Sequence, residues 1–162
     1  MVGGNGRRRE VIVIVDDEEM ILASLNSYLA LETDYEVVAF TRPGAALEYV
    51  AGHEVDLVIS DYFMPEMDGI TFLGRVRALK PQVPRILLTG YSDKENAIKG
   101  INEVGLYQYI EKPWDNDRLR LVIRSGIEQQ QLLRDLQLKV EQVNRAYADL
   151  QGIQQRILQT FA

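Results

Sequence analysis

Five polar residues of this 162-residue chain combine the chemistry that is needed to hold a phosphoryl group. They are Asp16, Asp17, Asp61, Thr89 and Lys112. An all-oxygen acidic cluster without Cys or His is typical of Mg²⁺, which takes few protein ligands and keeps several waters. A hydroxyl and an ammonium bind phosphoryl oxygens. One carboxylate is then free to act as a nucleophile and to form an aspartyl-phosphate.

These residues end or follow short apolar runs that read as β-strands. The runs span 11–15, 35–40, 55–60, 85–90 and 106–110. Three of them are nearly continuous Val, Ile and Leu, which is typical of parallel strands that helices cover on both faces. Helical patterns separate the runs at 18–31, 43–51, 70–79 and 93–104. This alternation predicts a doubly wound α/β fold with five parallel strands in the order 2-1-3-4-5.

The predicted sheet brings the acidic residues together. Ligands of doubly wound sheets bind at the carboxyl ends of the strands where the strand order reverses, here between the first and third strands. Asp16 and Asp17 follow the first strand, and Asp61 follows the third. Any one of the five residues alone would be an ordinary polar residue at a strand end. Five of them at the ends of four strands favour a site that binds Mg²⁺ and a phosphoryl group.

The tail carries a different pattern. From Leu133 to Ile157 apolar residues recur at alternating steps of three and four, and Gln154 is the one polar residue among eight positions. This spacing predicts a coiled coil through which the chain forms a homodimer. The alternative is a single amphipathic helix packed on its own domain. It is less favoured because a lone helix that projects beyond the domain would expose the apolar stripe to solvent. We therefore expect a flexible lead at 1–8, a domain at 9–124 and a helical coiled-coil extension at 125–162.

Composition excludes several classes of protein. The net charge of −6 and the pI near 4.9 argue against direct binding to nucleic acid, which needs clustered Lys and Arg. No apolar run is long enough to cross a bilayer, and no secretory signal is visible. The chain has no cysteine and hence no disulfide framework. We expect a cytoplasmic protein that does not bind a membrane.

Four segments resemble the signature segments of the response-regulator receiver domain of two-component signalling. They are VDDEE, DYFMPEMDG, LLTGYS and YIEKPW, and the resemblance covers about residues 9–124. It implies a flavodoxin-like fold in which Asp61 accepts a phosphoryl group from a sensor histidine kinase. Asp17, Asp61 and the backbone carbonyl of Phe63 would bind Mg²⁺ directly, and Asp16 mainly through water.

The resemblance also implies roles for residues around the acceptor. Thr89 and Lys112 would bind phosphoryl oxygens, and Thr89 would act with Tyr109 at the aromatic switch position. A cis peptide bond is implied between Lys112 and Pro113, which X-Pro chemistry permits at modest cost.

Two aromatic residues are placed to affect how long the phosphate survives. Phe63 and Tyr91 lie two positions after the acceptor and two after the hydroxyl residue Thr89. Bulky rings there would exclude water from the attack path and slow hydrolysis, which predicts a long-lived phosphorylated state. The alternative is that both rings point to solvent and contact a partner.

The leading interpretation is a phosphorylation-controlled response regulator that transmits its change through the dimerising helix to an unknown output. We do not expect a dedicated turnover enzyme, because a haloacid-dehalogenase-type phosphatase needs an acid-base Asp where Phe63 stands. An FMN carrier is disfavoured by the acidic crevice and by the lack of a phosphate-binding loop after the first strand. A constitutive dimerisation scaffold stays as the alternative. The sequence names neither the kinase nor the output.

Overall fold

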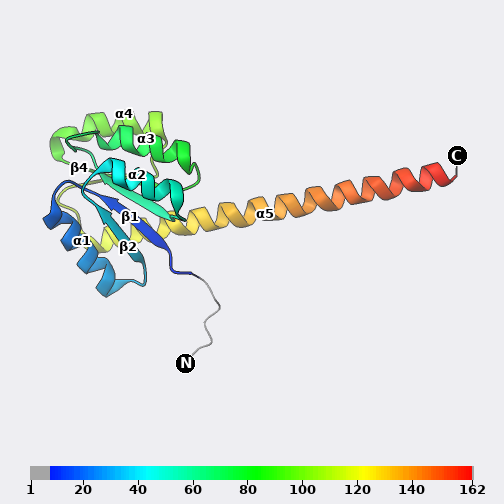
Figure 1. Cartoon of the computed structure of the whole chain (residues 1–162), viewed down its shortest axis with the longest axis horizontal. Helices are drawn as coiled ribbons and strands as arrows, with labels where there is room; N and C mark the ends of the chain where they lie inside the picture. The colour runs from blue at the N-terminus through cyan, green and yellow to red at the C-terminus, as the bar shows by residue number, and fades with distance from the viewer. Residues whose placement is uncertain (1–7, 162) are drawn as a thin grey trace, which may run out of the picture. The chain divides into compact units, whose positions relative to one another are not determined.

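The computed structural model describes residues 8–161, apart from the side chain of Tyr91. The strands are β1 (Val11–Val15), β2 (Glu36–Phe40), β3 (Leu57–Asp61), β4 (Arg85–Thr89) and β5 (Gln108–Glu111). They form one parallel sheet in the order β2-β1-β3-β4-β5 (Figure 1). The predicted fold class and strand order are confirmed. Residues 1–7 of the predicted lead lie outside the described residues.

Helices cover both faces of this sheet. They are α1 (Glu19–Glu32), α2 (Pro43–Gly52), α3 (Gly69–Leu79), α4 (Lys94–Val104) and α5 (Asn116–Thr160), with a 3₁₀ turn η1 (Tyr91–Asp93) before α4. Helix α1 and the first turns of α5 lie on one face, and α2, α3 and α4 lie on the other (Figure 1). This double cover explains the continuous apolar runs in the sequence.

Strand β1 shows how the sheet supplies both cores. Its residues alternate between the two faces, because successive side chains of a strand point in opposite directions. Ile12 and Ile14 pack into the core under α1 and α5. Val13 and Val15 pack into the core under α2, α3 and α4. All four side chains are fully buried, so β1 is fixed from both sides.

Strand β5 begins two residues later than the sequence pattern predicts. Helix α4 ends at Gly105, which has a left-handed backbone with φ of 62°. That conformation favours glycine and ends the helix at the predicted residue. The next residues carry the chain back to the sheet, where the Tyr107 N–H donates to the carbonyl of Arg85 at 2.9 Å.

The chain divides into two units, 1–127 and 128–162, and α5 contributes to both. In the first unit α5 buries Leu119, Val122, Ile123 and Ile127. In the second unit every residue from 131 to 161 except Gly152 is exposed. No helix among the described residues is long and apolar enough to cross a membrane.

Gly126 allows α5 to lie close to the amino ends of β3 and β5. A Cβ atom at this position would lie 3.2 Å from Leu57 Cδ1 and 3.3 Å from the Tyr107 ring. The Tyr107 hydroxyl and Ser125 Oγ are 2.6 Å apart, which holds the ring in place. A larger residue at this point of the helix would therefore press against Leu57 and the Tyr107 ring.

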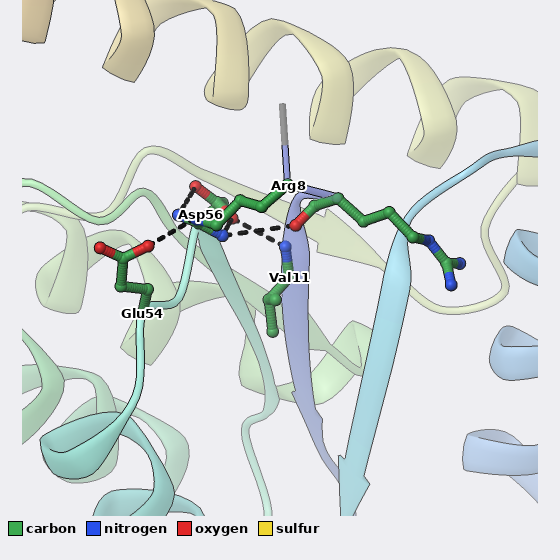
Figure 2. A network of polar contacts seen from close by, with 5 residues as sticks. Arg8, Val11, Glu54 and Asp56 are labelled. Carbon is green, nitrogen blue, oxygen red and sulfur yellow. Dashed lines mark hydrogen bonds and ion pairs between the residues drawn. The ribbon is translucent and has the colours of Figure 1, made fainter. Parts of the chain in front are cut away.

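A network of charges ties the chain before β1 to the start of β3 (Figure 2). Arg8 donates through both terminal nitrogens to the Asp56 carboxylate, at 2.9 and 3.1 Å. Asp56 Oδ2 also accepts the Val11 N–H at 2.7 Å, and Glu54 pairs with Arg8 Nε from the outer side. Asp56 is buried, so each of its contacts replaces hydration lost on folding. The network lies at the amino end of the sheet, opposite the acidic residues.

Candidate functional site

Three carboxylates converge where β1 and β3 end, as the strand order predicts. Asp61 is the last residue of β3, and Asp16 and Asp17 follow β1. One oxygen from each of the three carboxylates lies within 4.8 Å of the other two. Asp16 is fully buried and Asp61 nearly so, whereas Asp17 is exposed. The site is therefore an acidic cluster of two buried carboxylates and one exposed carboxylate.

Backbone contacts orient the two buried carboxylates. Asp16 Oδ1 accepts the N–H of Glu18 at 2.9 Å, which fixes the side chain as the chain leaves β1. Asp61 is held by its place in β3, where it is in register with Leu88 of β4. A backbone N–H thus orients the Asp16 carboxylate, and the strand register places Asp61.

Lys112 joins the cluster from the end of β5. Its ammonium lies 2.9 Å from Asp61 Oδ1 and 3.5 Å from Asp16 Oδ2. The Lys112–Pro113 peptide bond is cis. One positive charge thus faces three negative charges, and the pocket has a surplus of negative charge.

Burial and the neighbouring charges change the pKa values of Asp16, Asp61 and Lys112. Burial, together with the charges of Asp61 and Asp17, raises the pKa of Asp16 to about 6, against the Glu18 N–H and Lys112. Burial also raises the pKa of Asp61, although the hydrogen bond from Lys112 lowers it. Burial alone would lower the pKa of Lys112, but its contacts with Asp61 and Asp16 outweigh this and raise it. A cation placed among these carboxylates would relieve their mutual repulsion.

Two buried oxygens at the site have no hydrogen-bond partner among the described residues. They are Thr89 Oγ1 and Asp16 Oδ2. Buried polar atoms are normally satisfied, so orphans of this kind call for a ligand or an ion. An all-oxygen donor set with unused lone pairs fits Mg²⁺. Thr89 and Lys112 are joined by a backbone hydrogen bond at the ends of β4 and β5, and a hydroxyl and an ammonium on neighbouring strands fit a phosphoryl group. The residues present therefore fit both groups.

The remaining predicted residues lie around this pocket. Tyr109 is half-buried on β5, in register with Leu87 of β4, and packs on the face covered by α2, α3 and α4. Phe63 follows β3 by two residues, and 74% of its surface is exposed. The side chain of Tyr91 lies outside the described residues, and its backbone forms the start of η1.

Gly69 is a positioning residue that the sequence reasoning missed. Any Cβ atom there would overlap the backbone carbonyl oxygen of Asp61. The Gly69 N–H donates to the carbonyl of Tyr62 at 2.7 Å, and Asp68 caps α3 by accepting the Thr71 N–H at 2.7 Å. The loop after Asp61 is thereby folded back against the end of β3. The signal was present in the Asp68-Gly69 pair, which is typical of a turn before a helix.

The sequence profile of the response regulator receiver domain matches residues 12–124. The chain is 36% identical over 105 residues to the hydrogenase transcriptional regulatory protein HoxA of Bradyrhizobium diazoefficiens, a match that covers 65% of this chain and 22% of the relative. It is 34% identical over 106 residues to the transcriptional regulatory protein FixJ of the same organism, covering 65% of this chain and 51% of FixJ. The chain thus spans about a fifth to a half of these relatives.

Solved structures agree with the profile. The signal receiver domain of an HD domain-containing protein from Pseudomonas fluorescens Pf-5 superposes with a TM-score of 0.72 at 41% identity, covering 76% of this chain and 98% of that one. A CheY-like response regulator receiver domain protein from Methanospirillum hungatei gives a TM-score of 0.71 at 30% identity, with the same coverage of both chains. With the acidic pocket, the strand order and the profile in agreement, the chain belongs to the response regulator receiver domain family.

Proposed function

We propose that Asp61 accepts a phosphoryl group from a sensor histidine kinase and that the modified pocket switches an output carried by α5. The observation that carries this proposal is the meeting of Asp61 with Lys112, at 2.9 Å, beside two further carboxylates at the carboxyl ends of β1 and β3. Asp61 ends β3 in register with Leu88 of β4, and the contact with Lys112 holds its carboxylate toward the end of β5.

Asp17, Asp61 and the backbone carbonyl of Phe63 would hold Mg²⁺ directly, and Asp16 would hold it mainly through water. The ion would supply positive charge to the phosphoryl oxygens during transfer. A carboxylate oxygen of Asp61 attacks phosphorus as the bond from phosphorus to the kinase's histidine nitrogen breaks. Lys112 stays within reach of the same carboxylate and offsets the charge on the product.

Thr89 and Tyr109 are the proposed switch residues. Thr89 Oγ1 is buried and has no partner among the described residues, so a phosphoryl group reaches it only if the side chain or its cover moves. Tyr109 is half-buried on the neighbouring strand β5, where a change at the end of β4 would alter its packing. Movement of the hydroxyl toward the phosphate would therefore report modification to the β4–β5 side of the domain.

Phe63 and Tyr91 are proposed to slow the loss of phosphate. The exposed Phe63 ring would shield Asp61 only if it folds over the phosphoryl group after modification. Phosphate loss is followed in wild type, Phe63→Asn, Tyr91→Glu and the double variant. Faster loss in the variants supports the shield, and equal rates in all four would show that the rings serve a partner instead.

The proposed output is the helical extension at 125–162, which follows a receiver domain at 9–124. Its seam at 133–157 would join two copies of the chain, and its charge-neutral surface offers no direct nucleic-acid site. HoxA and FixJ are transcriptional regulatory proteins, and one structural neighbour belongs to an HD domain-containing protein. We leave the effector that the extension serves unassigned, and we propose a switch and not a turnover enzyme.

Phosphorylation by acetyl phosphate and Mg²⁺ tests the acceptor. Intact-protein mass should rise by one phosphoryl group in wild type and in the surface control Asp135→Asn, but not in Asp61→Asn. Asp17→Ala should lose Mg²⁺ binding more completely than Asp16→Ala, because Asp16 acts mainly through water. Modification of Asp61→Asn with wild-type yield would disprove the assignment.

A further inference from the structure

The apolar pattern of the seam continues one position beyond Ile157, to Phe161 directly after the end of α5. We define it as nine positions at alternating steps of three and four residues. They are Leu133, Leu136, Val140, Val143, Tyr147, Leu150, Gln154, Ile157 and Phe161. Its apolar members are between 48% and 84% exposed, with Phe161 the most exposed. Within the described residues the whole seam is therefore uncovered.

The spacing of the seam determines what kind of surface can cover it. Steps of three and four average 3.5 residues, whereas a straight helix has 3.6 residues per turn, so the stripe drifts by about 20° per heptad. Over four heptads a flat surface loses contact with such a stripe. A second helix that coils around the first in a left-handed sense follows it throughout.

Gln154 indicates which helix covers the seam. It is the single polar member of the seam, and its amide both donates and accepts hydrogen bonds. An identical glutamine at the same level satisfies it, whereas an apolar residue leaves a buried amide unpaired. The segment from 125 to 162 has four basic and four acidic residues, so two copies do not repel each other. Lys139 is the single charge at the positions that flank the seam.

We propose that the seam binds a second copy of the chain in parallel and in register, so that Gln154 faces the partner's Gln154. This inference rests on the pairing proposed above and specifies its direction and its register. The seam alternates a positions, which include Leu133 and Gln154, with d positions, which include Leu136. Antiparallel pairing sets each a position against a d position of the partner, and all d positions are Leu, Val or Ile. With Leu133 facing the partner's Ile157, antiparallel pairing would set Gln154 against the partner's Leu136. A slip of one heptad would set Gln154 against the partner's Tyr147 or Phe161.

Single cysteines in the full chain test the direction, because the chain has no cysteine of its own. Leu136→Cys places a thiol in the seam, and Leu138→Cys is the matched control on the opposite side of the helix. In the parallel dimer the two thiols introduced by Leu136→Cys face each other. In the antiparallel arrangement that sets Leu133 against Ile157 they lie about 27 Å apart, at 1.5 Å per residue. We expect disulfide formation about tenfold faster in Leu136→Cys than in Leu138→Cys, because the bond requires close approach.

A mixture of Leu136→Cys and Val143→Cys chains tests the register. Like-with-like disulfides should dominate, and a mixed disulfide of equal abundance would overturn the register. Gln154→Leu should raise the mixed product, because it removes the polar layer that opposes a slip. An unchanged product distribution in Gln154→Leu would overturn the role of Gln154.

Sedimentation of the full chain at tens of micromolar distinguishes a failure of the pairing from a failure of its direction and register. A monomer overturns both the proposed pairing and its register. A dimer without the Leu136→Cys disulfide, or with equally fast cross-linking of Leu138→Cys, overturns the parallel register and leaves the pairing. A dimer that cross-links through Leu136→Cys at the faster rate supports both.

Discussion

The two ends of the sheet hold buried carboxylates in opposite electrostatic states. At the amino end Asp56 accepts two hydrogen bonds from Arg8 and one from the Val11 N–H. At the carboxyl end Asp16 and Asp61 share the single ammonium of Lys112, and Asp16 Oδ2 has no hydrogen bond from the described residues. One end is complete within the fold, whereas the other has more negative charge than the fold neutralises.

This difference separates a structural cluster from a functional one. A satisfied buried acid stabilises the fold, because its contacts repay the cost of burial. An unbalanced acidic pocket costs stability and persists where a ligand completes it. Substitutions at the amino end should therefore lower stability and leave phosphorylation intact, and those at the carboxyl end should do the reverse.

Asp56→Ala is expected to give the largest effect. It removes the acceptor of the Val11 N–H and leaves Arg8 with its exposed partner Glu54 in place of a buried one, so the free energy of unfolding should fall by about 3 kcal/mol. Urea denaturation followed by circular dichroism measures the loss. The remaining folded protein should still take up phosphate from acetyl phosphate. Wild-type stability in Asp56→Ala would contradict the structural role of this end.

Asp16→Asn is expected to change stability in the opposite direction. At pH 7.5 without Mg²⁺ the free energy of unfolding should rise by about 2 kcal/mol, because the folded protein no longer carries a buried charge whose pKa is raised to about 6. The Glu18 N–H keeps an acceptor in the amide oxygen. The added stability conferred by Mg²⁺ should shrink in the same variant. A less stable Asp16→Asn chain would show that Asp16 is a structural acid like Asp56.

The stability of the fold should depend on pH through the titration of Asp16. The pKa of Asp16 rises from 3.8 to about 6 on folding, so the folded protein binds the proton more tightly than the unfolded chain. The stability from this group is present below pH 4 and is lost as the pH rises through about 6. The stability difference between Asp16→Asn and wild type should thus be small at pH 4 and grow toward pH 6.5, as measured by thermal unfolding in EDTA. A constant difference across this range would contradict the raised pKa.

Gly126→Ala should give the smallest effect, through packing at the amino end alone. The added Cβ lies against Leu57 and the Tyr107 ring, and we expect stability to fall by about 1 kcal/mol after the gain in helix propensity is counted. Gly152→Ala is the matched control, since nothing lies within 4 Å of its Cβ position. That variant should not lower the melting temperature. Equal effects at both glycines would mean that helix propensity alone governs α5.

Much of the site could be predicted because it depends on local order. Each of Asp16, Asp61 and Thr89 stands at the carboxyl end of an apolar run, and right-handed crossovers leave few ways to arrange those runs in one sheet. The convergence of the carboxylates follows from the strand order alone. The end of α4 at Gly105 was also predictable, because the residue's backbone freedom is a local property.

The amino-end network could not be predicted in this way. Arg8 and Asp56 are 48 residues apart, and nothing in the periodicity of either segment indicates a partner. Only the parallel pairing of β1 with β3 brings them together. The conflict between a side chain at Gly69 and the Asp61 carbonyl likewise exists only once the loop folds back onto the strand.

The sequence by itself determined the class of fold, the five polar residues of the pocket and the period of the seam, because periodicity and strand ends are properties of neighbouring residues. The tertiary structure alone decided how charge is balanced at each end of the sheet. Asp16 and Asp56 are the same residue type beside apolar strands, yet among the described residues Asp16 keeps an oxygen without a hydrogen bond and both oxygens of Asp56 accept hydrogen bonds. Proton affinity and bonding depend on burial and on distant partners, and these exist only in the folded chain.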